Sequence, residues 1–140
     1  MGVTPVGTHC ILELHGCSPD LLNDVLFVRD AVEQASKQSL STLLNLTSHQ
    51  FHPQGVTAIG LLAESHLSIH TWPECGYAGI DIFTCGEDAR PQQACDYLVK
   101  RFGARRHSLR ILPRGVTASD CAGPRRRECS GEVSLCRARN

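Results

Sequence analysis

The spacing of hydrophobic residues changes along the chain between the two-residue repeat of a strand and the three- to four-residue repeat of a helix. A helical repeat begins at Ser18, where a serine N-cap followed by proline favours helix initiation, and it ends near Lys37. A second helical repeat runs from Asp88 to Phe102. The remaining patterns indicate strands at residues 8–14, 40–47, 56–63, 67–72, 77–84 and 106–112.

The order of these elements, β-α-β-β-β-β-α-β, predicts the fold class. Strands grouped between two helices favour an α+β fold, a two-layer α/β sandwich in which a mainly antiparallel sheet carries helices on one face. The other face also needs a cover, and we expect it to pack in a dimer. Proline and glycine in segment 49–55 indicate a loop between two of the strands.

Composition is that of an ordinary globular protein. The chain has 140 residues, 41% hydrophobic and 20% charged, which suits one domain over residues 1–115. No run approaches the roughly 18 apolar residues of a membrane helix, so we expect no membrane partner. The N-terminus lacks the pattern of a secretory signal, and we therefore expect a cytoplasmic location.

Charge is balanced overall, with 14 basic and 14 acidic residues, but it is unevenly distributed. Residues 101–140 carry 10 basic and 3 acidic side chains. Residues 116–140 lack periodicity and are expected to form a flexible basic tail. The triplet Arg125 to Arg127 has no interleaved aromatic residues, so a solvated end is favoured over a nucleic-acid partner.

Eight cysteines raise the question of disulfides or a structural metal. They contain no C-x-x-C pair and the chain shows no secretory signal, so reduced thiols are favoured over disulfides or zinc. His66 and His70 could bind a metal if they lay on a helix, but the residues around them alternate as in a strand. We therefore expect no metal.

Reactive side chains are concentrated between Glu64 and Tyr77, where hydroxyls, imidazoles and carboxylates occur close together. A serine hydrolase is one interpretation, but the G-x-S-x-G motif is absent. A structural interpretation is that His66 and His70 line the polar face of a half-buried strand. The density of reactive groups argues for chemistry at this segment.

Three stretches of the sequence carry a family resemblance. The chain resembles the prokaryotic S-adenosylmethionine decarboxylase proenzymes, which are pyruvoyl-dependent, in Ala63-Glu64-Ser65-His66-Leu67-Ser68-Ile69-His70-Thr71-Trp72-Pro73-Glu74, Gly76-Tyr77-Ala78 and Asp81-Ile82-Phe83-Thr84-Cys85-Gly86. A looser similarity extends from about residue 9 to 115 and includes the segment Phe51-x-Pro53-x-Gly55-Val56. The basic tail lies outside the resemblance.

The resemblance implies self-cleavage between Glu64 and Ser65 into chains 1–64 and 65–140. In that chemistry the Ser65 hydroxyl attacks the preceding carbonyl and converts the amide into an ester, which a strained backbone assists. A base then removes the α-proton and the ester is eliminated, leaving a covalent pyruvoyl group derived from Ser65. His70 matches the proton acceptor of this processing, a role that suits an imidazole.

The resemblance also implies a reaction and a partner. The pyruvoyl group would decarboxylate S-adenosylmethionine to the aminopropyl donor for spermidine biosynthesis, and Cys85 matches the proton donor to the substrate carbon. Phe51 and Glu74 match positions that bind substrate, as an aromatic face and as a partner for ribose hydroxyls. Processed chains are expected to form a homodimer with shared active sites.

The lysine count supports this cofactor independently. Decarboxylation needs an electron sink, which pyridoxal phosphate on a lysine often supplies. Only Lys37 and Lys100 are present, and both lie at expected solvated positions on helices. A pyridoxal lysine is therefore not favoured.

Two positions depart from the family pattern and leave alternatives open. Thr57 replaces a serine expected to support processing, and Cys75 replaces a tyrosine expected before Gly76. One alternative keeps the pyruvoyl chemistry but acts on ornithine or arginine. The other is a non-catalytic regulatory homologue whose basic tail contacts an acidic partner.

Overall fold

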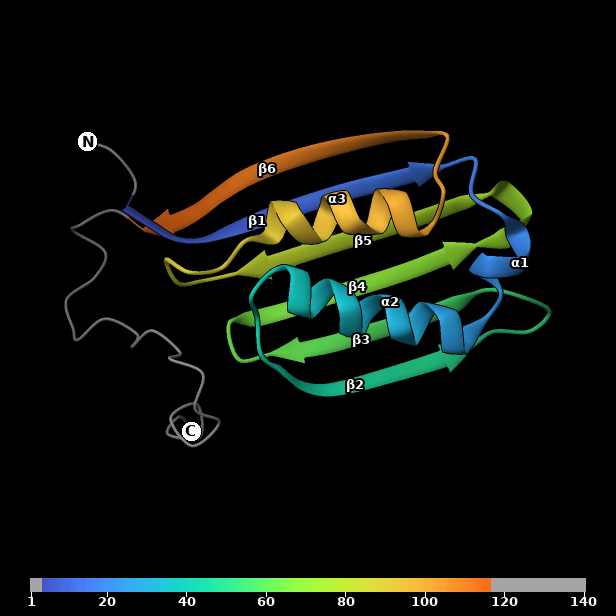
Figure 1. The fold of residues 1–140 in the computed structure, drawn as a ribbon, viewed down its shortest axis with the longest axis horizontal. Helices are drawn as coiled ribbons and strands as arrows, with labels where there is room; N and C mark the ends of the chain where they lie inside the picture. Colours follow the sequence, from blue (N-terminus) through green and yellow to red (C-terminus); the bar gives the residue numbers. More distant parts are fainter. Residues whose placement is uncertain (1–3, 117–140) are drawn as a thin grey trace.

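Six antiparallel strands form one sheet, and two long helices lie across one of its faces (Figure 1). This computed structural model describes residues 4–116. The elements are β1 (Thr4–His15), α1 (Pro19–Leu22), α2 (Val25–Gln38), β2 (Leu43–Gln50), β3 (Val56–Leu62), β4 (Ser65–Trp72), η1 (Pro73–Cys75), β5 (Tyr77–Thr84), α3 (Pro91–Arg101) and β6 (Arg106–Val116). The predicted two-layer α+β sandwich is confirmed, while its packing in a dimer stays a prediction.

The strand order β2-β3-β4-β5-β1-β6 places β4 and β5 at the centre of the sheet. β4 pairs with both β3 and β5, so the reactive segment is an interior strand. Ser65 at the start of β4 lies opposite Thr84, and His70 near its end lies opposite Thr57. The register therefore separates these two residues along the length of the sheet.

Alternate residues of the strands form the core under the helices. Cys10, Leu12 and Leu14 of β1 are fully buried, and the apolar faces of α2 and α3 cover them and the neighbouring strands. Phe27 of α2 and Phe102 after α3 meet edge to face, with ring centroids 5.2 Å apart. Together these contacts bury one face of the sheet, and within residues 4–116 they leave the other, here called the open face, without helices (Figure 1).

The helix predicted from Ser18 to Lys37 is two helices. α1 ends at Leu22, and α2 begins at Val25 with Asp24 as its N-cap. The Asp24 carboxylate accepts hydrogen bonds from the backbone N–H groups of Leu26 and Phe27, at 3.0 and 3.1 Å. Because aspartate satisfies helix N-terminal donors better than it sits inside a helix, the chain starts a new helix here.

Removing this cap should destabilise the protein measurably. Replacing Asp24 with alanine leaves two N–H groups of α2 without their acceptor, and we expect the free energy of unfolding to fall by about 1 kcal/mol. Urea denaturation followed by circular dichroism measures the change. Asp20→Ala is the matched control because Asp20 is an exposed carboxylate that is not an N-cap, and an equal loss in both variants would contradict the role of Asp24.

Several element boundaries also differ from the sequence predictions. The strand predicted at 40–47 runs from Leu43 to Gln50, because His49 and Gln50 pair with β3 and shorten the predicted loop to 51–55. β4 begins two residues earlier than predicted, at Ser65. The last helix begins at Pro91 and not at Asp88, since proline suits the first helical position.

The last described residue, Val116, is the first residue of the predicted tail. β6 continues to Val116, and the rest of the expected tail, 117–140, lies outside the described residues. Over residues 4–116, every helix is too short or too polar to cross a membrane.

Candidate active site

The two residues of the predicted cleavage site meet Cys85 at one end of the sheet. Glu64 lies in the turn between β3 and β4, and Ser65 is the first residue of β4. The Glu64 carbonyl oxygen accepts hydrogen bonds from the Cys85 backbone N–H at 3.1 Å and from its Sγ at 2.9 Å. One residue therefore directs two donors at the carbonyl that the Ser65 hydroxyl would attack.

Thr42 holds the other side of this turn. Its carbonyl accepts the Ala63 N–H at 2.9 Å, and its own N–H donates to the Glu64 carboxylate at 3.0 Å. Glu64 is only 7% exposed, so its side chain anchors the turn and is not available to solvent. The peptide bond before Ser65 is thus held from both sides.

The backbone of Ser65 has an unusual conformation. Its φ angle is 156°, a positive value that residues with a side chain rarely adopt. Strained conformations of this kind cost of order 1–3 kcal/mol and occur often at functional sites. The strain lies at the bond that the sequence predicts to break.

A hydrogen-bonded cluster lies beside Ser65 on the open face. The Asp81 carboxylate of β5 accepts hydrogen bonds from His9 Nε2 at 2.8 Å, from His66 Nε2 at 2.9 Å and from the Ser68 hydroxyl. Burial opposes ionisation of Asp81, but the three hydrogen bonds together outweigh burial and lower its pKa. Asp81 is therefore an ionised carboxylate that orients two imidazoles.

Within residues 4–116, the only metal-ligating side chains that lie close enough together to hold an ion are those of His9, His66 and Asp81. One ligand atom each of His9, His66 and Asp81 lies within 4.8 Å of the others. Imidazole nitrogens and a carboxylate oxygen are zinc ligands. The hydrogen bonds between these groups already account for their arrangement without an ion.

A second group of predicted site residues lies at the opposite end of β4. His70 Nδ1 is 2.9 Å from the Thr57 hydroxyl on β3. The threonine therefore keeps the hydroxyl contact in spite of its extra methyl group. His70 is five residues from Ser65, which at about 3.3 Å per residue is a separation of about 16 Å. One chain does not bring the predicted base to the predicted cleavage site.

Phe51 and Glu74 belong to this second end. Phe51 opens the loop 51–55 and is 46% exposed, with its ring centroid 4.7 Å from that of His49. Glu74 is an exposed residue of η1, which directly follows β4. Both side chains are accessible, as substrate-binding residues must be.

Tyr77 lies at the His70 end of the open face and offers a neutral hydrogen-bond donor there. Its hydroxyl donates to the Glu13 carboxylate, and its ring lies 5.3 Å from the rings of His15 and Trp72. Burial, with the Glu13 carboxylate, raises the pKa of Tyr77 to about 12. The phenol therefore stays protonated at neutral pH.

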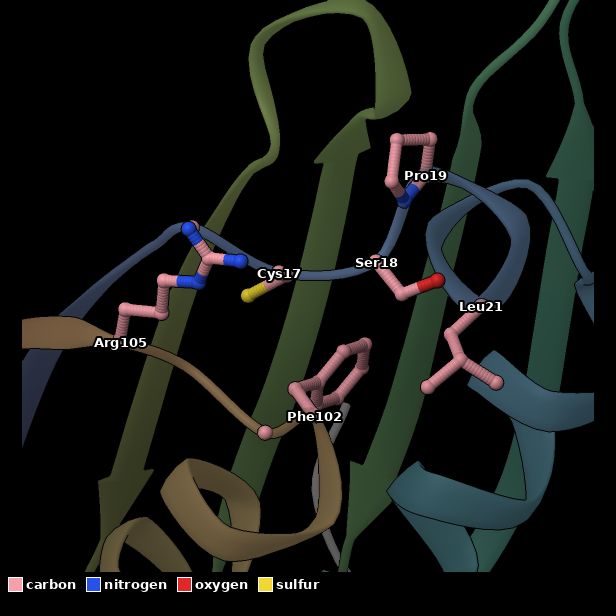
Figure 2. A pocket seen from close by; sticks show the side chains of 8 residues that line it. Cys17, Ser18, Pro19, Leu21, Phe102 and Arg105 are labelled. Atoms are coloured by element: carbon pink, nitrogen blue, oxygen red, sulfur yellow. The ribbon is translucent and has the colours of Figure 1, made fainter.

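A hollow on the molecule does not coincide with these residues. It has a volume of about 480 Å³ and lies around Cys17, Phe102 and Arg105, beside α1 and the end of α3 (Figure 2). None of the predicted site residues lines it. The reactive groups lie instead at the two ends of the open face, which no helix in the described part of the chain covers.

Sequence reasoning did not identify three residues that contact the site. His9 and Asp81 share the open face with His66, which strand alternation in β1 and β5 could have indicated. Thr42 acts through its backbone, so its side-chain type carried no signal. The cysteines Cys10, Cys17 and Cys95 are buried thiols outside any disulfide.

Comparisons with known proteins show which family this chain resembles. Residues 8–115 match the family model for S-adenosylmethionine decarboxylase. The chain is 54% identical over 114 residues to an S-adenosylmethionine decarboxylase proenzyme of Prochlorococcus marinus (strain MIT 9313), covering 81% of this chain and 91% of that protein. It is 39% identical over 111 residues to the proenzyme of the same name from Thermodesulfovibrio yellowstonii, covering 79% and 82%.

A solved structure supports the same assignment. The crystal structure of the adenosylmethionine decarboxylase from Aquifex aeolicus superposes with a TM-score of 0.76 at 35% identity, covering 81% of this chain and 94% of that chain. Sequence and fold therefore agree over the same domain. The chain belongs to the S-adenosylmethionine decarboxylase family.

Proposed function

We propose that this chain cuts itself between Glu64 and Ser65 and then decarboxylates S-adenosylmethionine with a pyruvoyl group formed from Ser65. The product would be the aminopropyl donor of spermidine biosynthesis. The observation that carries the proposal is the Glu64 carbonyl, which accepts two hydrogen bonds from Cys85 directly before a strained serine.

The first step is the conversion of the Glu64–Ser65 amide into an ester. The Ser65 hydroxyl attacks the Glu64 carbonyl carbon, and negative charge develops on the carbonyl oxygen. The N–H and S–H groups of Cys85 already point at that oxygen, so they stabilise the charge without rearrangement. The bonds from Thr42 keep the acyl group in place during the attack.

The second step is elimination of the ester. A base removes the α-proton of Ser65, the Cβ–Oγ bond breaks, and Glu64 leaves as the new C-terminus of chain 1–64. The remaining enamine takes up water and loses ammonia, which leaves the ketone at residue 65. His70 is the proposed base, but at about 16 Å it must come from a second chain.

A dimer through the open face meets this requirement. Four apolar side chains on this face, from β3, β4 and β6, are 40–53% exposed. They are Ile59, Leu61, Trp72 and Leu112. A two-fold axis that lies midway between the two sheets and perpendicular to the strands would make β4 of the partner run in the opposite direction. The His70 end of the partner's β4 would then face Ser65. Sheets packed face to face lie about 10 Å apart, a gap that two side chains can bridge.

The same dimer would complete the substrate site. Phe51 and Glu74 lie at the His70 end of each chain, so a partner would also supply an aromatic face for the adenine and a carboxylate for the ribose hydroxyls. The Ser65 end supplies the reactive group. Each complete site would then combine two chains.

The residues present fit a pyruvoyl group better than a pyridoxal one. Lys37 and Lys100 are both exposed on helices, whereas Ser65 starts the central strand beside Cys85. A pyruvoyl group at residue 65 supplies the electron sink that loss of carbon dioxide from an amino acid requires. Cys85 is placed beside residue 65 to hold the proton that the substrate carbon takes up.

Release of labelled carbon dioxide tests the function. We expect release from carboxyl-labelled S-adenosylmethionine and none from labelled ornithine or arginine, because only the nucleoside has an adenine that can stack on the Phe51 ring. Release only from ornithine or arginine would keep the pyruvoyl chemistry but contradict the substrate. A cleaved protein that releases carbon dioxide from none of them would favour a regulatory homologue.

A further inference from the structure

Two hydrogen bonds connect the Ser65 hydroxyl to the Asp81 carboxylate through the neighbouring histidine. Ser65 Oγ lies 3.4 Å from His66 Nδ1, and His66 Nε2 lies 2.9 Å from Asp81 Oδ2. Hydroxyl, imidazole and carboxylate in this order form the arrangement that activates serine nucleophiles on many unrelated folds. The contact at 3.4 Å is long, as catalytic hydrogen bonds often are before the reaction begins.

The carboxylate determines which nitrogen of His66 carries the hydrogen. Asp81 is ionised, so it can only accept, and the Nε2 atom of His66 must donate to it. In a neutral imidazole the other nitrogen, Nδ1, then carries the lone pair. That lone pair faces the Ser65 hydroxyl and can accept its proton.

The backbone of Ser65 makes this contact possible. Adjacent residues of a regular strand point to opposite faces of the sheet, so a serine would normally not reach the ring of the next residue. The φ angle of 156° at Ser65 departs from that geometry and brings its hydroxyl toward His66 on the open face. The strained conformation therefore aligns the nucleophile with a base in the same chain.

We propose that His66 is the general base of the first cleavage step and that Asp81 is its positioning residue. The inference rests on the self-cleavage proposed above. His66 Nδ1 takes the proton of the Ser65 hydroxyl as the bond from Oγ to the Glu64 carbonyl carbon forms. The carbon–nitrogen bond then breaks, and the same proton passes from His66 to the departing nitrogen of Ser65.

This step needs no other reactant, because the proton that leaves oxygen ends on nitrogen. In this scheme the two proposed bases act in different steps and come from different chains. His66 acts on the hydroxyl of its own chain, whereas His70 of a second chain would remove the α-proton afterwards.

Cleavage rates of His66→Ala test the proposal. Purified uncleaved protein is incubated, and denaturing mass spectrometry follows the appearance of chains 1–64 and 65–140. We expect His66→Ala to cleave about a hundredfold to ten-thousandfold more slowly than the unaltered chain, the usual contribution of a general base. His107→Ala is the matched control, because His107 is an exposed histidine of β6 that lies opposite Leu14, at the other end of the sheet from Ser65, and we expect it to cleave at close to the unaltered rate.

Two further measurements distinguish a base from a structural residue. Added imidazole should restore cleavage to His66→Ala, which it would not do if the variant were misfolded. Hydroxylamine cuts esters, so it should release chain 1–64 from His70→Ala, which stops after the first step, and not from His66→Ala, which stops before it. Asp81→Asn should also slow cleavage, and Asp81→Glu should recover part of the rate by keeping a carboxylate acceptor.

The outcomes separate this inference from the proposed function. Cleavage of His66→Ala at the unaltered rate, or its cutting by hydroxylamine to the same extent as His70→Ala, would overturn the role of His66 and leave self-cleavage standing. An unaltered chain that never cleaves would overturn the proposed function itself.

Discussion

Replacing Ser65 with alanine should leave the chain as one 15.3 kDa species without decarboxylase activity. The reason is chemical: alanine has no hydroxyl to attack the Glu64 carbonyl, so neither the ester nor the ketone can form. The effect on activity should be complete and not graded, because the variant lacks the reactive group entirely. Denaturing mass spectrometry over time, with a carbon dioxide assay on the same samples, measures both consequences.

Ser18→Ala is the matched control for this variant. Ser18 is an exposed serine whose side chain caps no helix donor, so its loss should leave cleavage and activity intact. Cleavage of Ser65→Ala at the same bond would assign the cut to a contaminating protease and contradict self-processing. Borohydride treatment with S-adenosylmethionine should attach substrate to chain 65–140 of the unaltered protein and of Ser18→Ala, and should attach none to Ser65→Ala.

Mixing two inactive variants should restore cleavage, and this is the second large effect expected. His70→Ala keeps Ser65 but lacks the proposed base of the second step. Ser65→Ala keeps that base but cannot be cut. If His70 acts on the partner chain, a mixed dimer gives the intact Ser65 of the first variant a working His70. Co-expression with distinct tags and intact-mass analysis should therefore show cleavage of the His70→Ala chain only.

A double variant provides the control for this experiment. Co-expression of His70→Ala with a chain carrying both Ser65→Ala and His70→Ala provides no His70 to remove the α-proton in the second step, so no chain should be cut. If the single variants together also stay whole while each forms mixed dimers, His70 does not act between chains. Cleavage of His70→Ala by itself would instead remove His70 from the mechanism.

Most of the fold could be predicted from residue spacing. Strand alternation in β5 and the helical repeat of α3 were recognisable because buried apolar residues recur there at the spacing of a strand and of a helix. The division between α1 and α2 was missed because one apolar stripe continues across Asp24, and only the side-chain cap interrupts it. The early start of β4 was missed because Ser65 and His66 are polar although they lie in the sheet.

The candidate site was predictable as a set of residues but not as an arrangement. The motif around Ser65 predicted a cleavage site, and the role of Cys85 was predicted from the same resemblance. Pairing of β4 with β5 then placed the Cys85 donors on the Glu64 carbonyl. That contact joins residues 21 positions apart, and no local pattern predicts it.

The sequence by itself determined the chemistry available to this protein: a serine at a predicted cleavage bond, histidines on a strand, and two lysines on solvated helix faces. Only the tertiary structure decided which of these groups can meet. Because a strand rises about 3.3 Å per residue, β4 keeps Ser65 and His70 at opposite ends of the sheet. Pairing of β4 with β5 instead brings Asp81 to His66 and Cys85 to the Glu64 carbonyl.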